Sequence, residues 1–115
     1  MGKDIRERTY AFGLKVVTLC RVMPSDRVSS ALCSQLVRSG TSIGANVEEA
    51  QDGMSRADFL KSMTIALKEA RETYYWLRIL KDIKLIGGKD ADSLLEESSQ
   101  LVKILVSIVK STKSG

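Results

Sequence analysis

The chain has 115 residues, a formal net charge of +4, one proline, two cysteines and no histidine. The lack of histidine excludes Ser-His-Asp and Cys-His catalysis and the usual zinc ligand sets. The mild positive charge permits contact with nucleic acid or an acidic partner but does not require it.

The first two predicted helices span about residues 4–23 and 27–51. Apolar residues recur at helical spacing along both. Pro24 ends the first helix because proline has no amide hydrogen to continue the bonding. Ser25 or Asp26 can cap the second helix, since either side chain can accept a hydrogen bond from a first-turn amide.

The third and fourth predicted helices span about residues 56–86 and 91–110. The third carries an apolar seam close to a heptad repeat, and Gly87 and Gly88 are expected to end it. Four amphipathic helices with short connections form antiparallel neighbours. We therefore predict an all-α protein, with residues 1–115 forming a single antiparallel, up-down-up-down four-helix bundle domain.

The segment 38–50 of the second helix is unusually rich in small residues. Gly40 and Gly44 lie one turn apart, and each costs roughly 1 kcal/mol of helix propensity relative to alanine. A helix that contains such glycines usually approaches another backbone closely. We expect a neighbouring helix to pass close to this segment.

Polar residues also recur at helical spacing along the second and third predicted helices. Because buried polar groups must be hydrogen-bonded, we expect a network that ties these two helices together or forms a subunit interface. A ligand or nucleic-acid contact is the alternative for the same side chains. The set comprises Ser42, Asn46, Glu49, Glu69 and Glu72.

The acidic residues also permit a metal-site hypothesis. Glu49 and Asp52 lie one turn apart, as do Glu69 and Glu72, and carboxylates are suitable ligands for Mg²⁺. This pairing resembles the all-α nucleotide pyrophosphatases, although the order of the two motifs is unusual and Lys68 lies beside the second pair. We expect no catalytic residue, metal or cofactor, and keep a Mg²⁺-dependent nucleotide pyrophosphohydrolase as an alternative.

Basic residues are concentrated on the first and third helices, so we expect one basic side of the protein. Such a surface would bind phosphate groups of RNA or DNA without sequence preference. The candidates are Arg6, Arg8, Lys15, Arg21, Lys61, Lys68, Arg71, Arg78, Lys81 and Lys84.

Tyr74, Tyr75 and Trp76 form an aromatic triplet that spreads around most of a helix. They cannot all face one core, so at least one is expected at a surface. Packing between subunits is the preferred interpretation, ahead of base stacking.

The cysteines and the hydropathy pattern indicate the cellular compartment of the protein. Cys20 and Cys33 fit reduced core thiols better than a disulfide framework. No apolar run approaches the roughly 20 residues that a membrane-spanning helix needs, and the start of the chain shows no signal-peptide pattern. We expect a cytoplasmic protein without a membrane partner.

Two motifs resemble the signature of the 23S rRNA intervening-sequence four-helix-bundle proteins. The first joins Gln35–Ser39 to Ser42–Ala50. The second joins Asp58-Phe59 to the sequences Ile-Ala-Leu-Lys-Glu-Ala and Glu-Thr-Tyr-Tyr-Trp-Leu that follow it. Gln51 departs from the pattern, because many members have Glu-Gly where this chain has Ala-Gln.

The resemblance implies a left-handed antiparallel bundle, assembly into a homopentameric ring and no established enzymatic activity. Some relatives are encoded within bacterial large-subunit rRNA genes, and a related bundle assists a retroelement reverse transcriptase and contacts nucleic acid. We therefore expect a non-enzymatic, oligomeric structural or adaptor protein that binds structured RNA or DNA through basic helix surfaces. A module for a protein partner is a further alternative.

Overall fold

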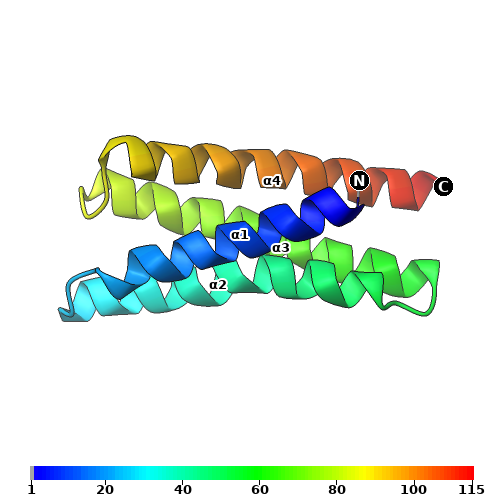
Figure 1. Ribbon diagram of the computed structural model, residues 1–115, viewed down its shortest axis with the longest axis horizontal. Helices are drawn as coiled ribbons and strands as arrows, with labels where there is room; N and C mark the ends of the chain where they lie inside the picture. Colours follow the sequence, from blue (N-terminus) through cyan, green and yellow to red (C-terminus); the bar gives the residue numbers. More distant parts are fainter. Residues whose placement is uncertain (1) are drawn as a thin grey trace.

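A computed structural model describes residues 2–115 of the chain, with side chains from Ile5 onward. Its helices are α1 (Gly2–Arg21), α2 (Arg27–Gln51), α3 (Arg56–Asp82) and α4 (Gly88–Ser114). They run alternately in opposite directions, with both termini and the α2–α3 connection at one end (Figure 1). The prediction of an all-α, antiparallel four-helix bundle is confirmed.

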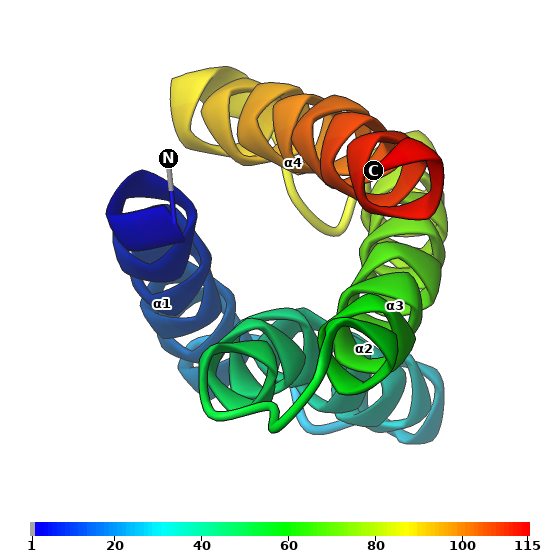
Figure 2. The same cartoon turned by 90° about the vertical axis from the view of Figure 1, so that its right-hand side faces the viewer.

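Each helix packs against its neighbours in chain order, and α4 returns to contact α1 more sparsely. Viewed along the bundle, α1 and α3 occupy opposite corners (Figure 2). The outer surfaces of these two helices therefore face away from each other.

The apolar stripes of the four helices meet in a common core. Phe12, Leu36, Leu77 and Leu101 contribute fully buried side chains from α1 to α4 respectively. The remaining surface of α2, α3 and α4 is mostly polar, whereas α1 also exposes Tyr10, Leu14 and Val17. None of the described helices combines the length and apolar composition that crossing a lipid bilayer requires.

Side-chain caps define where α2 and α3 begin. The Asp26 carboxylate accepts a hydrogen bond from the Ser29 amide at 3.0 Å, and this contact lowers the pKa of Asp26. Asp26 rather than Ser25 is therefore the α2 cap. The Ser55 hydroxyl accepts from the Asp58 amide at 3.1 Å at the start of α3.

The two glycines of α2 lie against α1. A Cβ atom on Gly44 would lie 3.2 Å from the carbonyl oxygen of Thr9, and one on Gly40 would lie 2.9 Å from Val16 Cγ1. The backbone of α1 thus passes close to Gly44, as the small residues of this segment predicted. The absence of a side chain at these positions permits the close packing of α1 on α2, at the cost of helix propensity.

Cys20 of α1 and Cys33 of α2 are free thiols on neighbouring helices. Burial, with Cys33 nearby, raises the pKa of Cys20 to about 12. The Cys20 thiol is therefore protonated at neutral pH, which makes it a poor nucleophile.

The third helix ends at Asp82, earlier than predicted, and the glycines after it do not terminate it. Lys84 instead adopts a left-handed conformation, with φ 62°. The amides of Lys84 and Leu85 donate to the carbonyls of Lys81 and Leu80, at 2.9 and 3.0 Å. This is the Schellman arrangement, in which glycine usually occupies the position of Lys84. The ends of α1 and α4 also differ from the predicted ends, since they lie at Arg21 and Ser114.

Replacing Lys84 with glycine is expected to stabilise the protein by about 1 kcal/mol, because glycine adopts the left-handed conformation without steric cost. Urea unfolding followed by circular dichroism measures this change. Lys84→Ala is the matched control, since it removes the same charge but keeps the backbone strain. An equal gain in Lys84→Ala would assign the effect to charge and contradict the backbone explanation.

Candidate nucleic-acid interface

The predicted basic residues do not form one surface. Four of them lie on α1, and the others lie on α3 or in the turn that follows it. Because α1 and α3 are diagonal in the bundle (Figure 2), their outward side chains point in different directions. The expectation of a single basic side is therefore wrong, and the up-down-up-down topology is the reason.

Several of these cations form ion pairs between neighbouring helices. Arg6 of α1 donates to Glu48 of α2 at 2.9 Å. Arg8 donates twice to the Glu97 carboxylate of α4, at 2.7 and 3.1 Å, and this pair is about three-quarters buried. Lys81 lies 3.0 Å from Asp92 of α4. These residues connect helices, which leaves them less available for phosphate groups.

The outer face of α3 presents a different arrangement, which we call the α3 stripe. Its members recur every three, four or seven residues, so they lie within about 100° of one another around the helix axis. All of them are exposed. The α3 stripe consists of Lys61, Lys68, Arg71, Tyr75 and Arg78.

No acidic residue interrupts the α3 stripe between its first and last members; Asp82 follows one turn later. Within the described part of the chain, Lys61, Lys68 and Arg71 form no ion pair. The stripe is about 25 Å long at 1.5 Å per residue. Four cations thus line one face of α3, and Glu72, one turn after Lys68, borders this face and is bound by Arg38.

Arg38 of α2 is a residue that the sequence analysis did not single out. Its guanidinium donates to Glu69 at 3.1 Å and also to Glu72 of α3. Glu72 accepts a further hydrogen bond from the Trp76 indole at 3.0 Å. The sequence contains a signal for this role, because Arg38 is the only basic residue between Arg27 and Arg56.

The predicted polar network is therefore only partly correct. Glu69 and Glu72 do connect α3 to α2, but Ser42 and Asn46 donate to carbonyls of their own helix at 2.7 and 2.8 Å. Glu49 is exposed. Short polar side chains in helices commonly bond to the carbonyl four residues earlier, and this local bond takes the place of the predicted link between helices.

A buried hydroxyl pair provides the other polar link between α2 and α3. Thr73 Oγ1 donates to Ser39 Oγ at 2.9 Å, and both residues are fully buried. This pair lies beside the Arg38 contacts and fixes the same register between the helices.

The proposed magnesium ligands do not meet. Glu69 and Glu72 lie level with Arg38, whereas Glu49 is eleven residues further along α2, about 16 Å at 1.5 Å per residue. Mg²⁺ needs ligand oxygens at about 2.1 Å. Among the described residues, no group of three or more acidic, cysteine or histidine side chains could hold a metal ion. The geometry gives no support to the hydrolase alternative.

The three residues of the aromatic triplet in α3 have three different environments. The Tyr74 ring lies 5.7 Å from the Arg78 guanidinium carbon. Trp76 is partly buried and bonds to Glu72. Tyr75 is 51% exposed, with its ring edge-on to Trp76 at a centroid distance of 5.1 Å. The triplet does not form one contact surface, and only Tyr75 projects from the bundle.

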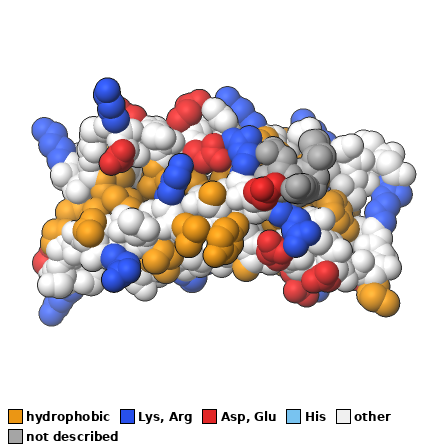
Figure 3. Space-filling model, viewed as in Figure 1, with side chains coloured by type: hydrophobic (Ala, Val, Ile, Leu, Met, Phe, Trp, Pro, Cys, Tyr) orange, Lys and Arg blue, Asp and Glu red, His pale blue; other side chains and the backbone are white. Residues whose placement is uncertain are grey.

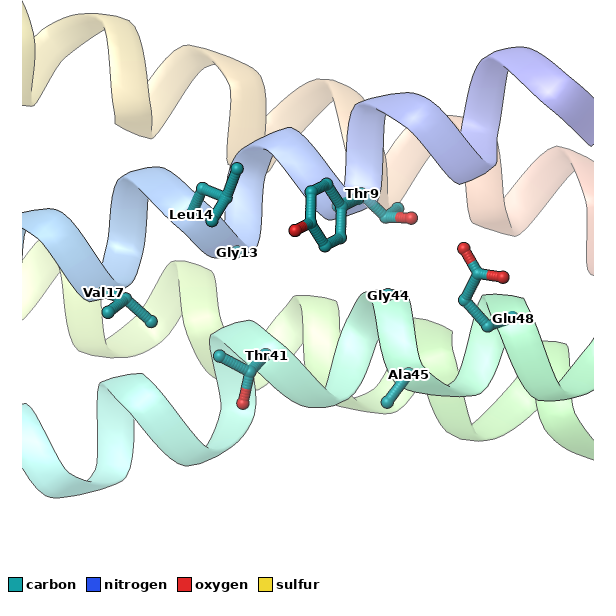
Figure 4. A pocket seen from close by; sticks show the side chains of 9 residues that line it. Thr9, Gly13, Leu14, Val17, Thr41, Gly44, Ala45 and Glu48 are labelled. Atoms are coloured by element: carbon teal, nitrogen blue, oxygen red, sulfur yellow. The ribbon is translucent and has the colours of Figure 1, made fainter.

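An apolar groove between α1 and α2 is a surface that sequence reasoning missed. It has a volume of about 330 Å³, with Gly13 and Gly44 among its lining residues. Tyr10, Leu14 and Val17 of α1 border it and are 64, 52 and 36% exposed. Figure 4 shows Leu14 and Val17 on the α1 side of the groove, and hydrophobic side chains gather on this face in Figure 3.

Comparison with known proteins identifies the family. The family model described as 23S rRNA-intervening sequence protein matches residues 3–107. The chain is similar to the crystal structure of a protein with unknown function from the S23 ribosomal protein family of Bacteroides thetaiotaomicron VPI-5482. Sequence identity is 37%, the TM-score is 0.87, and the match covers 95% of this chain and 97% of that chain. No curated protein matches the chain. The chain belongs to the 23S rRNA-intervening sequence protein family.

Proposed function

We propose that this protein is a cytoplasmic, non-enzymatic adaptor that binds structured RNA or DNA through the α3 stripe. One observation carries the proposal: four exposed cations follow one helix face without an intervening carboxylate. The free thiols Cys20 and Cys33 fit a reducing compartment.

Binding would rest on neutralisation of phosphate groups by Lys61, Lys68, Arg71 and Arg78. Each phosphate that is neutralised releases counterions, so affinity falls as salt rises. The slope of log K against log salt is about −0.9 per phosphate for duplex DNA and about −0.7 for single strands. Four contacts therefore give a slope of about −3 to −4, with little dependence on sequence.

The double variant Lys68→Gln/Arg71→Gln is expected to lower affinity at least tenfold at low salt and to reduce the magnitude of the salt slope by about 1.5 to 2. Fluorescence anisotropy with a labelled RNA hairpin, measured from 25 to about 200 mM salt, gives both quantities. Both substitutions lie in the middle of the α3 stripe, so they remove two of the four expected phosphate contacts.

Lys15→Gln/Arg21→Gln is the matched control, because it removes the same charge from exposed positions of α1. It is expected to change affinity much less. An equal loss in both variants would show that net charge rather than the α3 stripe determines binding. A wild-type protein with no affinity at low salt would overturn the proposal.

Self-association is a second proposal, favoured by the apolar groove between α1 and α2. Exposed apolar groups of this kind commonly mark a contact with another protein surface. We assign the occupant as a second copy of this chain, in agreement with the homopentamer that the family resemblance implies. A closed ring of five uses head-to-tail contacts, so the groove would meet a different surface of the next copy. Val28 and Ile83, exposed on α2 and just after α3, are candidates for that surface.

Leu14→Glu is expected to convert the assembly to monomers, because it places a charge in the middle of the apolar contact. The mass measured by light scattering coupled to size-exclusion chromatography is expected to fall from five times the 12.7 kDa chain mass in the wild type to a single chain mass in Leu14→Glu. Met54→Glu is the control, since Met54 is 94% exposed in the α2–α3 connection and outside the groove. A monomeric wild type, or an intact assembly in Leu14→Glu, would contradict this assignment.

A further inference from the structure

The position of Tyr75 within the α3 stripe indicates which form of nucleic acid the stripe suits. Tyr75 lies four residues after Arg71 and three before Arg78, so it is in the same row as the cations. It is 51% exposed although it is a large aromatic residue. A helix face that only neutralised phosphates would not need an aromatic ring between its arginines.

The surroundings of Tyr75 hold it in place. Its ring meets the Trp76 ring at an interplanar angle of 69°. Trp76 in turn donates to Glu72, and Arg38 of α2 binds the same carboxylate. The ring is therefore supported through a chain of contacts that reaches the neighbouring helix, which reduces the entropy lost when a ligand stacks on it.

We propose that the α3 stripe binds single-stranded segments of nucleic acid, with one unpaired base stacked on Tyr75 and the adjoining phosphates on Lys68, Arg71 and Arg78. An aromatic ring stacks on unpaired bases of any sequence, whereas a duplex keeps its base faces covered. The stripe is long enough for about seven stacked nucleotides, at 3.4 Å per phosphate. The inference rests on the proposed function and specifies the ligand of the same surface.

Anisotropy titrations with a labelled ten-nucleotide RNA, the DNA of the same sequence and the corresponding RNA duplex test this inference. Single strands are expected to bind more tightly than the duplex at equal salt. Tyr75→Leu is expected to weaken single-strand binding about tenfold and to leave duplex binding unchanged, whereas Tyr75→Phe retains the wild-type affinity. Trp76 is the only tryptophan, so its emission should change when a base stacks beside it.

The outcomes separate this inference from the proposed function. Equal affinity for single strand and duplex, or Tyr75→Leu binding like the wild type, overturns base stacking and leaves phosphate binding intact. The same loss for both ligands in Tyr75→Leu also overturns it, since that would indicate a general disturbance of the stripe. No binding of any strand at low salt overturns both proposals. Similar affinities for the RNA and DNA strands would show that the 2′-hydroxyl is not recognised.

Discussion

Replacing Gly44 with leucine is expected to destabilise the bundle by about 3 kcal/mol. A Cβ atom at this position would already lie 3.2 Å from the carbonyl oxygen and 3.3 Å from the carbonyl carbon of Thr9. These are backbone atoms of α1, so they cannot move away by a change of rotamer. The leucine side chain must therefore push α1 away from α2 and loosen the core contacts of Phe12 and Val16.

Urea unfolding of Gly44→Leu beside two comparison variants isolates this effect. Ser34→Leu places the same side chain at an exposed position of α2 and is expected to change stability by less than about 0.5 kcal/mol. Gly44→Ala should lie between the two, because a gain of about 1 kcal/mol in helix propensity offsets part of the tight contact. If Gly44→Leu were as stable as Ser34→Leu, the close approach of α1 at Gly44 would be refuted.

The fold was predictable because each helix carries a continuous apolar stripe. The Gly44 contact shows how far this reasoning extends, since small residues at helical spacing correctly indicated a close neighbour. Helix ends were less predictable. Lys84 occupies a left-handed position that usually belongs to glycine, and the real glycines follow later in the chain. A sequence rule based on residue preference therefore placed the end of α3 too late.

The candidate site was predicted only in part, for reasons of topology and of competing hydrogen bonds. Counting charges on α1 and α3 found the cations but not the diagonal arrangement that separates them. Spacing alone also cannot show that Ser42 and Asn46 bond to their own helix instead of the next one. The groove beside Leu14 depends on the exact distance between α1 and α2, which only the three-dimensional packing reveals.

Arg38→Met is expected to destabilise the protein by about 2 kcal/mol, although nearly half of the Arg38 side chain is exposed. Its partners are less accessible, with side-chain exposures of 14% for Glu69 and 29% for Glu72. Without the guanidinium, two carboxylates one turn apart repel each other in a partly desolvated position. Methionine keeps most of the apolar stem, so chemical unfolding reports mainly the lost charge.

Arg6→Met is the matched control, because Arg6 and Glu48 are 47 and 50% exposed and such pairs contribute little. It is expected to cost less than about 0.5 kcal/mol. Adding Glu69→Gln and Glu72→Gln to Arg38→Met should recover part of the lost stability, because the repulsion is removed. A loss in Arg38→Met no greater than in Arg6→Met would mean that packing and the Thr73–Ser39 contact, rather than this ion cluster, hold α2 against α3.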